Sequence, residues 1–467
     1  MRRHTSKEAF LESGSIEVEG GYKMFKWEMK IKFKSLITVV IITLICAISL
    51  MSMQLIEEKR SLRDFSTKYA TDSFIFLNQM KWEDDLSEND KVNYPKSEYT
   101  YRLYDSVRNS IWNLSYSDNY NEMNRLQSFL SLLTLRNEFD ANNEEVVQKS
   151  DVLHTWTIVS AGIPYDDVDF YVKEKGEADF PKNMFLLQAK YFESLFIKNI
   201  RMIFDDELSN ISYLYNMYDQ IVPICTILLS FYITYPTISR SYRNGQIKML
   251  LNAGQKRTNI YFARWLSNII YVWLLIIPPT IVMSFVAGIK GYMTSNCYPM
   301  VILSNPLSRV STIPNYFDIA VNNGRYANLY PNAIGRTAPL GEYFMYGGDI
   351  SDSLEIIPFI EFILLVIVLI SLFICFLVAF IQLFSILFNH EFIALISSGI
   401  VYGICYVSSG NFMQGEQLNL SPFTFFSAVR IIEGVHNTTF LLSTISLITS
   451  TLILVFVGNL LFAKKEI

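Results

Sequence analysis

Six long stretches of the chain carry no Asp, Glu, Lys or Arg and consist mainly of apolar residues. These stretches are residues 35–56, 220–238, 265–289, 362–389, 392–415 and 437–463. A membrane-spanning helix needs ~20 predominantly apolar residues, and each stretch supplies about that length. We therefore expect an all-α membrane protein with six transmembrane helices, at residues 35–56, 220–239, 265–289, 358–387, 392–410 and 438–463.

A long polar region, residues 57–219, separates the first two predicted spans. Two sets of apolar residues recur within it at helical spacing, namely Leu103, Val107, Ile111 and Leu114, and Met123, Leu126, Leu130 and Leu133. The region has the size of an independent domain. We expect a large, mainly helical domain outside the bilayer.

Residues 183–204 are apolar enough to suggest a further span, yet they include the charged residues Lys190, Glu193, Lys198 and Arg201. A charged side chain at the centre of a bilayer costs ~2.5–3.5 kcal/mol on insertion scales. We therefore interpret this stretch as an aromatic-rich helix that leads down to the membrane.

The N-terminal segment, residues 1–34, ends in FKWEMKIKFK, which alternates strictly between apolar and charged residues. That period is typical of a strand. A lone strand beside a membrane helix has no partner for its backbone groups, so we expect an interfacial helix instead.

Charged residues make up only 18% of the 467 residues, against ~25% in typical soluble domains. Residues 56–220 hold 29 acidic and 18 basic residues, a balance of −11, whereas residues 240–264 hold six basic residues and no acid. Lys and Arg near span ends favour the cytoplasmic side. The pattern predicts a multi-pass cell-membrane protein with both termini in the cytoplasm and excludes a soluble enzyme; we expect the membrane to be a bacterial plasma membrane.

The later spans are joined by an extracellular loop at 290–357, a cytoplasmic turn at 388–391 and an external amphipathic segment at 411–437. Four of the five cysteines lie in apolar runs and only Cys297 lies in a loop. Their spacing matches no zinc site and no disulfide framework, and the four histidines are scattered. We expect no metal site.

The cytoplasmic segment 240–264 reads RSYRNGQIKMLLNAGQKRTNIYFAR. On a helical projection one face holds Ile247, Leu250, Leu251 and Gly254, and the other holds Lys248, Asn252 and Gln255. The pattern predicts a short amphipathic helix under the membrane. Two interpretations remain open from the residues alone: a positively charged anchor, or a docking helix for a cytoplasmic partner.

The layout resembles the type-2 ABC exporter permease family, the membrane subunits of ATP-driven exporters. Four features carry the resemblance: the basic segment YKMFKWEMKIKFKS before the first span, the large external domain, the segment GQIKMLLNAGQKR between the second and third spans, and NLSPFTFFSAVRIIEG before the last. The resemblance covers about residues 22–55 and 220–467.

The family's cytoplasmic segment has a Gly, then an apolar helix, then a Gly or Pro followed by Ser/Thr-Arg. By position, Gly245, Ile247, Leu250, Leu251, Gly254 and Arg257 match this pattern. The resemblance implies that these residues, with Arg243 and Lys248, couple the permease to its ATPase. One departure is that the family often has acidic residues before the first Gly, where this chain has Ser239 to Arg243.

The resemblance implies a cytoplasmic ABC ATPase subunit and a second permease subunit, like or unlike, as partners, with no role for nucleic acid. No GxxxxGK(S/T) run occurs in the chain, so we expect no ATP site of its own and no directly bound cofactor; ATP acts through the partner. His390 and Glu391 form the other cytoplasmic turn. We interpret this turn as a second contact with the ATPase, or alternatively as a solvated turn.

We expect export of a small amphipathic substrate, with antimicrobial or signalling peptides favoured because the external domain is acidic; drugs and lipids stay open. The alternative is a non-transporting sensor or mechanical transmitter that acts through its external domain. An intramembrane enzyme is disfavoured because no span carries a pair of His, Glu or Asp residues.

Overall fold

The structure is a computed structural model. It describes residues 24–56, 102–111, 119–137, 149–165, 182–203, 207–303, 354–410, 418–433 and 436–465, with short gaps in the first, second and last of these ranges. Everything stated below about the structure refers to these residues. Residues 1–23 of the predicted N-terminal segment, and all of residues 57–101 and 304–353, lie outside them.

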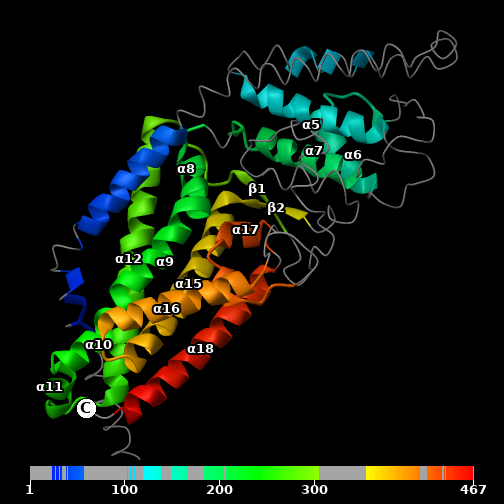
Figure 1. The fold of residues 1–467 in the computed structure, drawn as a ribbon. Helices are drawn as coiled ribbons and strands as arrows, with labels where there is room; N and C mark the ends of the chain where they lie inside the picture. Colours follow the sequence, from blue (N-terminus) through cyan, green and yellow to red (C-terminus); the bar gives the residue numbers. More distant parts are fainter. Residues whose placement is uncertain are drawn as a thin grey trace, which may run out of the picture.

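Five described helical segments are long and apolar enough to cross a membrane. They are Asn210–Arg243, α12 (Arg257–Lys290), α15 (Phe359–Leu387), α16 (Glu391–Ser408) and α18 (Phe440–Lys464). They correspond to the predicted second to sixth spans and run alongside one another in Figure 1. The protein is therefore a mainly helical, multi-pass membrane protein. The predicted first span corresponds to the shorter apolar helix Val40–Ile56, and its crossing of the membrane stays a prediction.

The segment Asn210–Arg243 is built from four consecutive pieces. These are α8 (Asn210–Asn216), the π-helix η2 (Met217–Ile221), α9 (Val222–Thr234) and α10 (Pro236–Arg243). The helix therefore begins well before the predicted residue 220. The prediction stopped at Asp219, but the structure pairs that carboxylate with Arg430 at 2.8 Å, so the helix passes through it.

α15 is the central helix of the bundle. It packs against α9, α12, α16 and α18, and most of its side chains are buried. The peripheral helices expose apolar side chains instead, including Ile396 and Ile404 of α16 and Leu452 and Phe456 of α18. Exposed apolar surface of this extent is typical of a lipid-facing or subunit-facing surface.

One end of the bundle carries a group of three further helices, α5 (Tyr120–Asn137), α6 (Lys149–Val159) and α7 (Lys182–Ile197) (Figure 1). They enclose their own apolar core, in which Trp156 packs edge-on against Phe129 and donates its indole N–H to the Ile163 carbonyl at 2.7 Å. The stretch 183–204 thus contributes α7 to this helical group, and α7 is not among the described helices that are long and apolar enough to cross a membrane. The extracellular position of this group stays a prediction.

The predicted loop 290–357 contains the one departure from a purely helical fold among the described residues. β1 (Pro299–Leu303) and β2 (Leu354–Pro358) form a two-stranded antiparallel sheet in which Met300 lies opposite Ile357. β2 runs directly into α15, so the sheet lies at the same end of the bundle as α5–α7 (Figure 1).

The described residues of the N-terminal segment, between 24 and 33, are helical rather than extended. Glu28 and Lys32 lie one helical turn apart and both contact α12. The helical conformation agrees with the expectation that a lone strand here would lack partners for its backbone groups. Its position at the membrane interface stays a prediction.

Candidate functional site

The candidate site is α11 (Gln246–Asn252), a short helix between two membrane-spanning helices, at the end of the bundle opposite α5–α7 (Figure 1). A glycine in the left-handed region stands on each side of it: Gly245 with φ 69° and Gly254 with φ 82°. Glycine adopts this conformation without the steric cost that a Cβ adds. The two glycines let the chain turn out of α10, form α11, and turn again into α12.

The predicted apolar face of α11 points into the protein's own core. Ile247 is fully buried, and Leu250 and Leu251 are half-buried against a cluster that includes Ile260 and Phe462. These three residues therefore fasten α11 to the ends of α12 and α18. A partner would meet the opposite face.

The exposed face of α11 holds Lys248, Met249 and Asn252, and Met249 is 72% exposed. An exposed methionine beside a lysine combines an adaptable apolar contact with positive charge. The helix is amphipathic as predicted, but the face available for docking is the cationic one.

Arg257 lies at the start of α12 and caps the end of α18. Its guanidinium Nη1 donates to the carbonyls of Ala463 at 2.9 Å and Lys465 at 2.6 Å. A cation satisfies the unpaired carbonyls at a helix C-terminus and interacts favourably with the helix dipole. Arg257 therefore joins the start of α12, which follows α11, to the end of α18.

Glu391 is buried and paired rather than solvated, and the predicted contact of this turn with an ATPase stays a prediction. Arg240 Nε donates to one carboxylate oxygen at 2.7 Å and Arg243 Nη2 to the other at 2.9 Å. The Glu391 side chain is only 7% exposed, whereas both arginines are about half exposed. This ion pair, which we call the Glu391 clamp, joins α10 to the start of α16. The neighbouring His390 is exposed and forms no side-chain cap.

α10 is also held at its start, where Pro236 follows the turn at Tyr235. The hydroxyl of Ser385, on α15, donates to the Tyr235 carbonyl at 2.9 Å and accepts from the backbone N–H groups of Ile238 and Ser239 at 3.2 and 3.0 Å. Proline interrupts the hydrogen-bond ladder of a helix, and a neighbouring hydroxyl restores partners there. Ser385 therefore ties the junction between α9 and α10 to the central helix α15.

The N-terminal segment reaches the same region from the other side. Arg264 of α12 is 2% exposed, lies 3.4 Å from Glu28 and donates to the Thr237 carbonyl of α10 at 2.9 Å. Lys32 donates to Asn268 at 2.6 Å and Ser267 at 2.9 Å, and burial lowers its pKa to about 8. The N-terminal segment, α10 and α12 are thus joined by buried polar contacts.

The residues predicted from the sequence for the candidate site include Arg243, Lys248 and Arg257, but not Arg240 and Ser385, which support it. One signal was present: Arg240 and Arg243 are three residues apart on a helix, and Glu391 is the acidic residue of the facing turn. Ser385 gives no comparable signal, because a serine in an apolar run usually bonds within its own helix.

At the opposite end, α5–α7 are joined to the bundle through Arg201. Its guanidinium stacks over the rings of Tyr120 and Tyr292 at 4.5 and 5.4 Å and pairs with Glu207, just before α8. The Tyr191 and Tyr298 hydroxyls are 2.9 Å apart and link α7 to the strand region. The helical group is therefore attached to the ends of α8 and α12.

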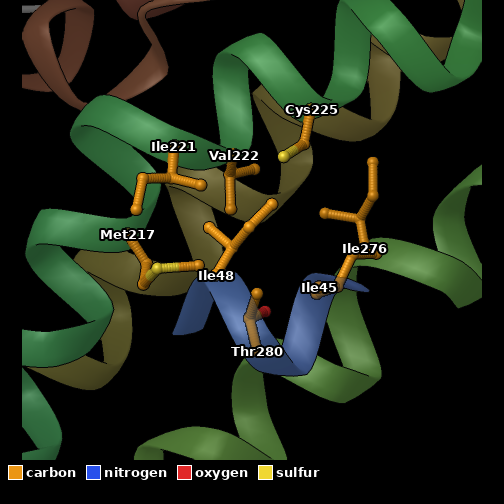
Figure 2. Close-up of a pocket in the computed structure, with 8 residues that line it drawn as sticks. All are labelled: Ile45, Ile48, Met217, Ile221, Val222, Cys225, Ile276 and Thr280. Carbon is orange, nitrogen blue, oxygen red and sulfur yellow. The ribbon is translucent and has the colours of Figure 1, made fainter. Parts of the chain in front are cut away.

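Between these ends, a pocket lies where the helix Val40–Ile56 meets η2, α9 and α12. Figure 2 shows its lining, which is Ile45, Ile48, Met217, Ile221, Val222, Cys225, Ile276 and Thr280. Its cavity volume is about 10 Å³, close to the minimum needed to hold one water molecule. The lining has no charged group, so it offers no site for an ionic ligand.

The described residues contain no group of three or more His, Cys, Asp or Glu side chains able to hold a metal ion. Searches of protein-family models, of curated proteins and of solved structures give no match for this chain.

Proposed function

We propose that this chain is the membrane-spanning permease subunit of an ATP-driven ABC exporter. A separate cytoplasmic ATPase subunit docks on α11 and hydrolyses ATP, and the substrate is small and amphipathic, such as an antimicrobial or signalling peptide. The observation that carries this proposal is the build of α11: one face is anchored in the bundle, and the other is exposed between two membrane-spanning helices.

The contacts around α11 support a coupling role. A push on α11 acts on α10, which pivots at Pro236 and is joined to α16 by the Glu391 clamp. It also acts on α12, which Arg257 joins to α18. An ATPase that binds α11 differently in its two nucleotide states would thereby shift the helices between two arrangements.

The charge of the exposed face supports a partner with an acidic docking groove. Residues 240–264 contain six basic residues and no acid; Lys248 is exposed next to Met249 on α11, and half-exposed Arg243 lies at the end of α10. The same charge supports a cytoplasmic position for this end. A second permease subunit, like or unlike, completes the proposed assembly.

The test uses Met249→Glu and Lys248→Glu, made in the full chain and expressed with its ATPase. Because both side chains are exposed, we expect normal insertion and an unchanged unfolding temperature, but loss of ATPase copurification and of ATP-dependent export. Lys464→Glu, at the same end but on α18, is the matched control and should retain both. If the two α11 variants copurify with the ATPase as the wild type does, α11 is only an anchor.

Leu250 and Leu251 are unsuitable for this test. Both are half-buried in the protein's own core, so a charge there would loosen α11 itself. Loss of binding in such variants would not separate docking from folding.

The alternative is a non-transporting sensor or mechanical transmitter. The joint at Arg201 favours it, because movement of α8 and α12 would reach α5–α7 directly. Transport assays in vesicles that contain the permease and its ATPase distinguish the two functions. An exporter moves a labelled cationic peptide across the vesicle membrane when ATP is supplied. A sensor binds the same peptide and moves none.

A further inference from the structure

The end of the bundle opposite α11 holds a second ionic cluster, in which carboxylates outnumber cations. Arg430 donates from Nε and Nη2 to the two oxygens of Asp219, at 2.8 Å each. Glu433 lies 4.0 Å from Arg430 Nη1 and accepts a hydrogen bond of 2.5 Å from the Tyr215 hydroxyl. The side chains of Asp219 and Glu433 are 7% and 1% exposed.

Two irregular elements bring these residues together. Asp219 lies in the π-helix η2, and π-helical turns occur frequently at functional sites. Arg430 and Glu433 lie in and directly after the short helix α17 (Ala428–Ile432), which packs on α15 and η2. Phe362 of α15 stacks on the Tyr215 ring with 6.3 Å between centroids. The predicted amphipathic segment 411–437 is thus buried at this point.

The charges of the cluster do not balance when both carboxylates are ionised. One guanidinium then faces two carboxylates, which leaves one negative charge in excess. Burying an uncompensated charge is strongly unfavourable. Glu433 Oε2 is also buried without a hydrogen-bond partner among the described residues. The geometry therefore requires an additional positive species at or near Glu433.

Among the described residues, the groups around Glu433 do not supply that charge. His436 is buried, and burial lowers its pKa to about 3, so the imidazole is neutral near neutral pH. The acidic residue of α15, Glu361, is exposed. Burial raises the pKa of Glu433 to about 7, against the opposing effect of Arg430 and of the Tyr215 hydrogen bond.

We propose that the Asp219–Arg430–Glu433 cluster is a proton-binding site, in which Glu433 takes up one proton from solution and thereby balances the Asp219–Arg430 pair. Release of the proton restores the excess negative charge and weakens the contact between α17 and η2. The site thus links pH to the joint between the Asn210–Arg243 helix and the segment before α18. This inference does not depend on the function proposed above.

The sign of the pH effect follows from the two states of Glu433. In the unfolded chain its pKa has the ordinary value of 4.5, and in the folded protein it is raised to about 7. The folded state then binds the proton more tightly, so stability is fully present below the lower value and is lost as pH rises toward the higher one. Above both values the stability is constant.

The first test measures thermal unfolding of the purified full chain in detergent from about pH 5 to about pH 8. We expect the wild-type unfolding temperature to fall over this range and that of Glu433→Gln to fall less, because the amide is neutral throughout. Asp219→Asn removes the carboxylate that competes with Glu433 for Arg430. The fall in unfolding temperature should therefore occur at lower pH in this variant. Glu361→Gln, which removes an exposed carboxylate, is the matched control and should behave as the wild type does.

The second test detects the proton without relying on stability. Infrared difference spectra between about pH 6 and about pH 8 should show the carbonyl band of a protonated carboxylic acid in the wild type and not in Glu433→Gln. Absence of the band in the wild type would overturn the proposal. So would a wild-type stability at about pH 8 that rises with sodium but not with potassium, because the site would then hold a metal cation.

Discussion

The two ends of the helical bundle use the same ionic chemistry in opposite proportions. At the α11 end, Arg240 and Arg243 share one carboxylate, and their side chains are 52% and 50% exposed. At the other end, Asp219 and Glu433 share one guanidinium, and both carboxylates are nearly buried. Water screens the excess positive charge of the Glu391 clamp, whereas the excess negative charge at Glu433 requires a proton. We therefore expect the first end to respond to salt and the second to pH.

The prediction with the largest expected effect concerns which end of the bundle faces the outside of the cell. Cys297 is exposed at the α5–α7 end, whereas the other four cysteines are half-buried in apolar helices. An impermeant thiol reagent applied to intact cells should label the wild type and fail to label Cys297→Ser. Labelling of Cys297 only after lysis would place the α5–α7 end in the cytoplasm and the α11 end outside, opposite to the predicted orientation.

The next prediction compares the same type of substitution, Arg to Met, at the two ends of the bundle. Arg430→Met leaves the buried Asp219 carboxylate without its cation, and we expect it to lower the free energy of unfolding by ~3–5 kcal/mol at neutral pH. Arg243→Met removes one half-exposed partner of Glu391 and should cost at most ~1 kcal/mol. Denaturant titration in detergent measures both, and equal losses would contradict the difference in burial between the two ends.

A smaller effect concerns the turn that sets the position of α11. Gly254 has φ 82°, so Gly254→Ala should lower the free energy of unfolding by ~1 kcal/mol and reduce ATPase binding. Gly399, inside α16, has open space at its Cβ position, and Gly399→Ala should stabilise the protein by ~0.5–1 kcal/mol. Denaturant titration in detergent measures the change in stability of both variants. A Gly254→Ala protein that is as stable as the wild type and binds the ATPase fully would argue against a defined position of α11.

The smallest expected effect is that of Glu391→Gln. The two arginines are half exposed, so the clamp should contribute ~1 kcal/mol or less, and about 1 M salt should remove most of the difference from the wild type. The Asp219–Arg430 pair should be affected less by the same salt because it is more buried. A salt-independent loss at Glu391 would show that the clamp is more enclosed than its exposure indicates.

Much of the fold could be predicted from the apolar runs. The last three spans begin and end within a few residues of the predictions, because Pro, Asn-His-Glu and Lys-Lys interrupt uncharged sequence there. The start of the Asn210–Arg243 helix could not be predicted, since the sequence does not show that Asp219 is neutralised by a residue 211 positions away. In a prediction from the sequence, a charged residue ends an apolar run. The helix itself can continue through that residue when an ion pair with a distant part of the chain neutralises the charge.

The candidate site was predictable to a similar degree. The two glycines and the amphipathic period located α11 correctly, because both signals are local. The amphipathic pattern does not show which face of α11 is available to a partner. In the structure the apolar face is anchored by Ile247 in the protein's own core. The pairing of Glu391 with Arg240 likewise depends on how α10 and α16 are placed in space.

The most direct test of the proposed function identifies what binds α11. With Met249→Cys in a chain that lacks the exposed Cys297, a thiol-directed photocrosslinker in native membranes should join the chain to a protein that contains a GxxxxGK(S/T) loop. The crosslink yield should change when ATP is added, and Lys464→Cys should give a much lower yield. A photocrosslink from Met249→Cys to lipid alone, with the same result in the presence of ATP, would contradict a docking role for α11 and with it the proposed permease.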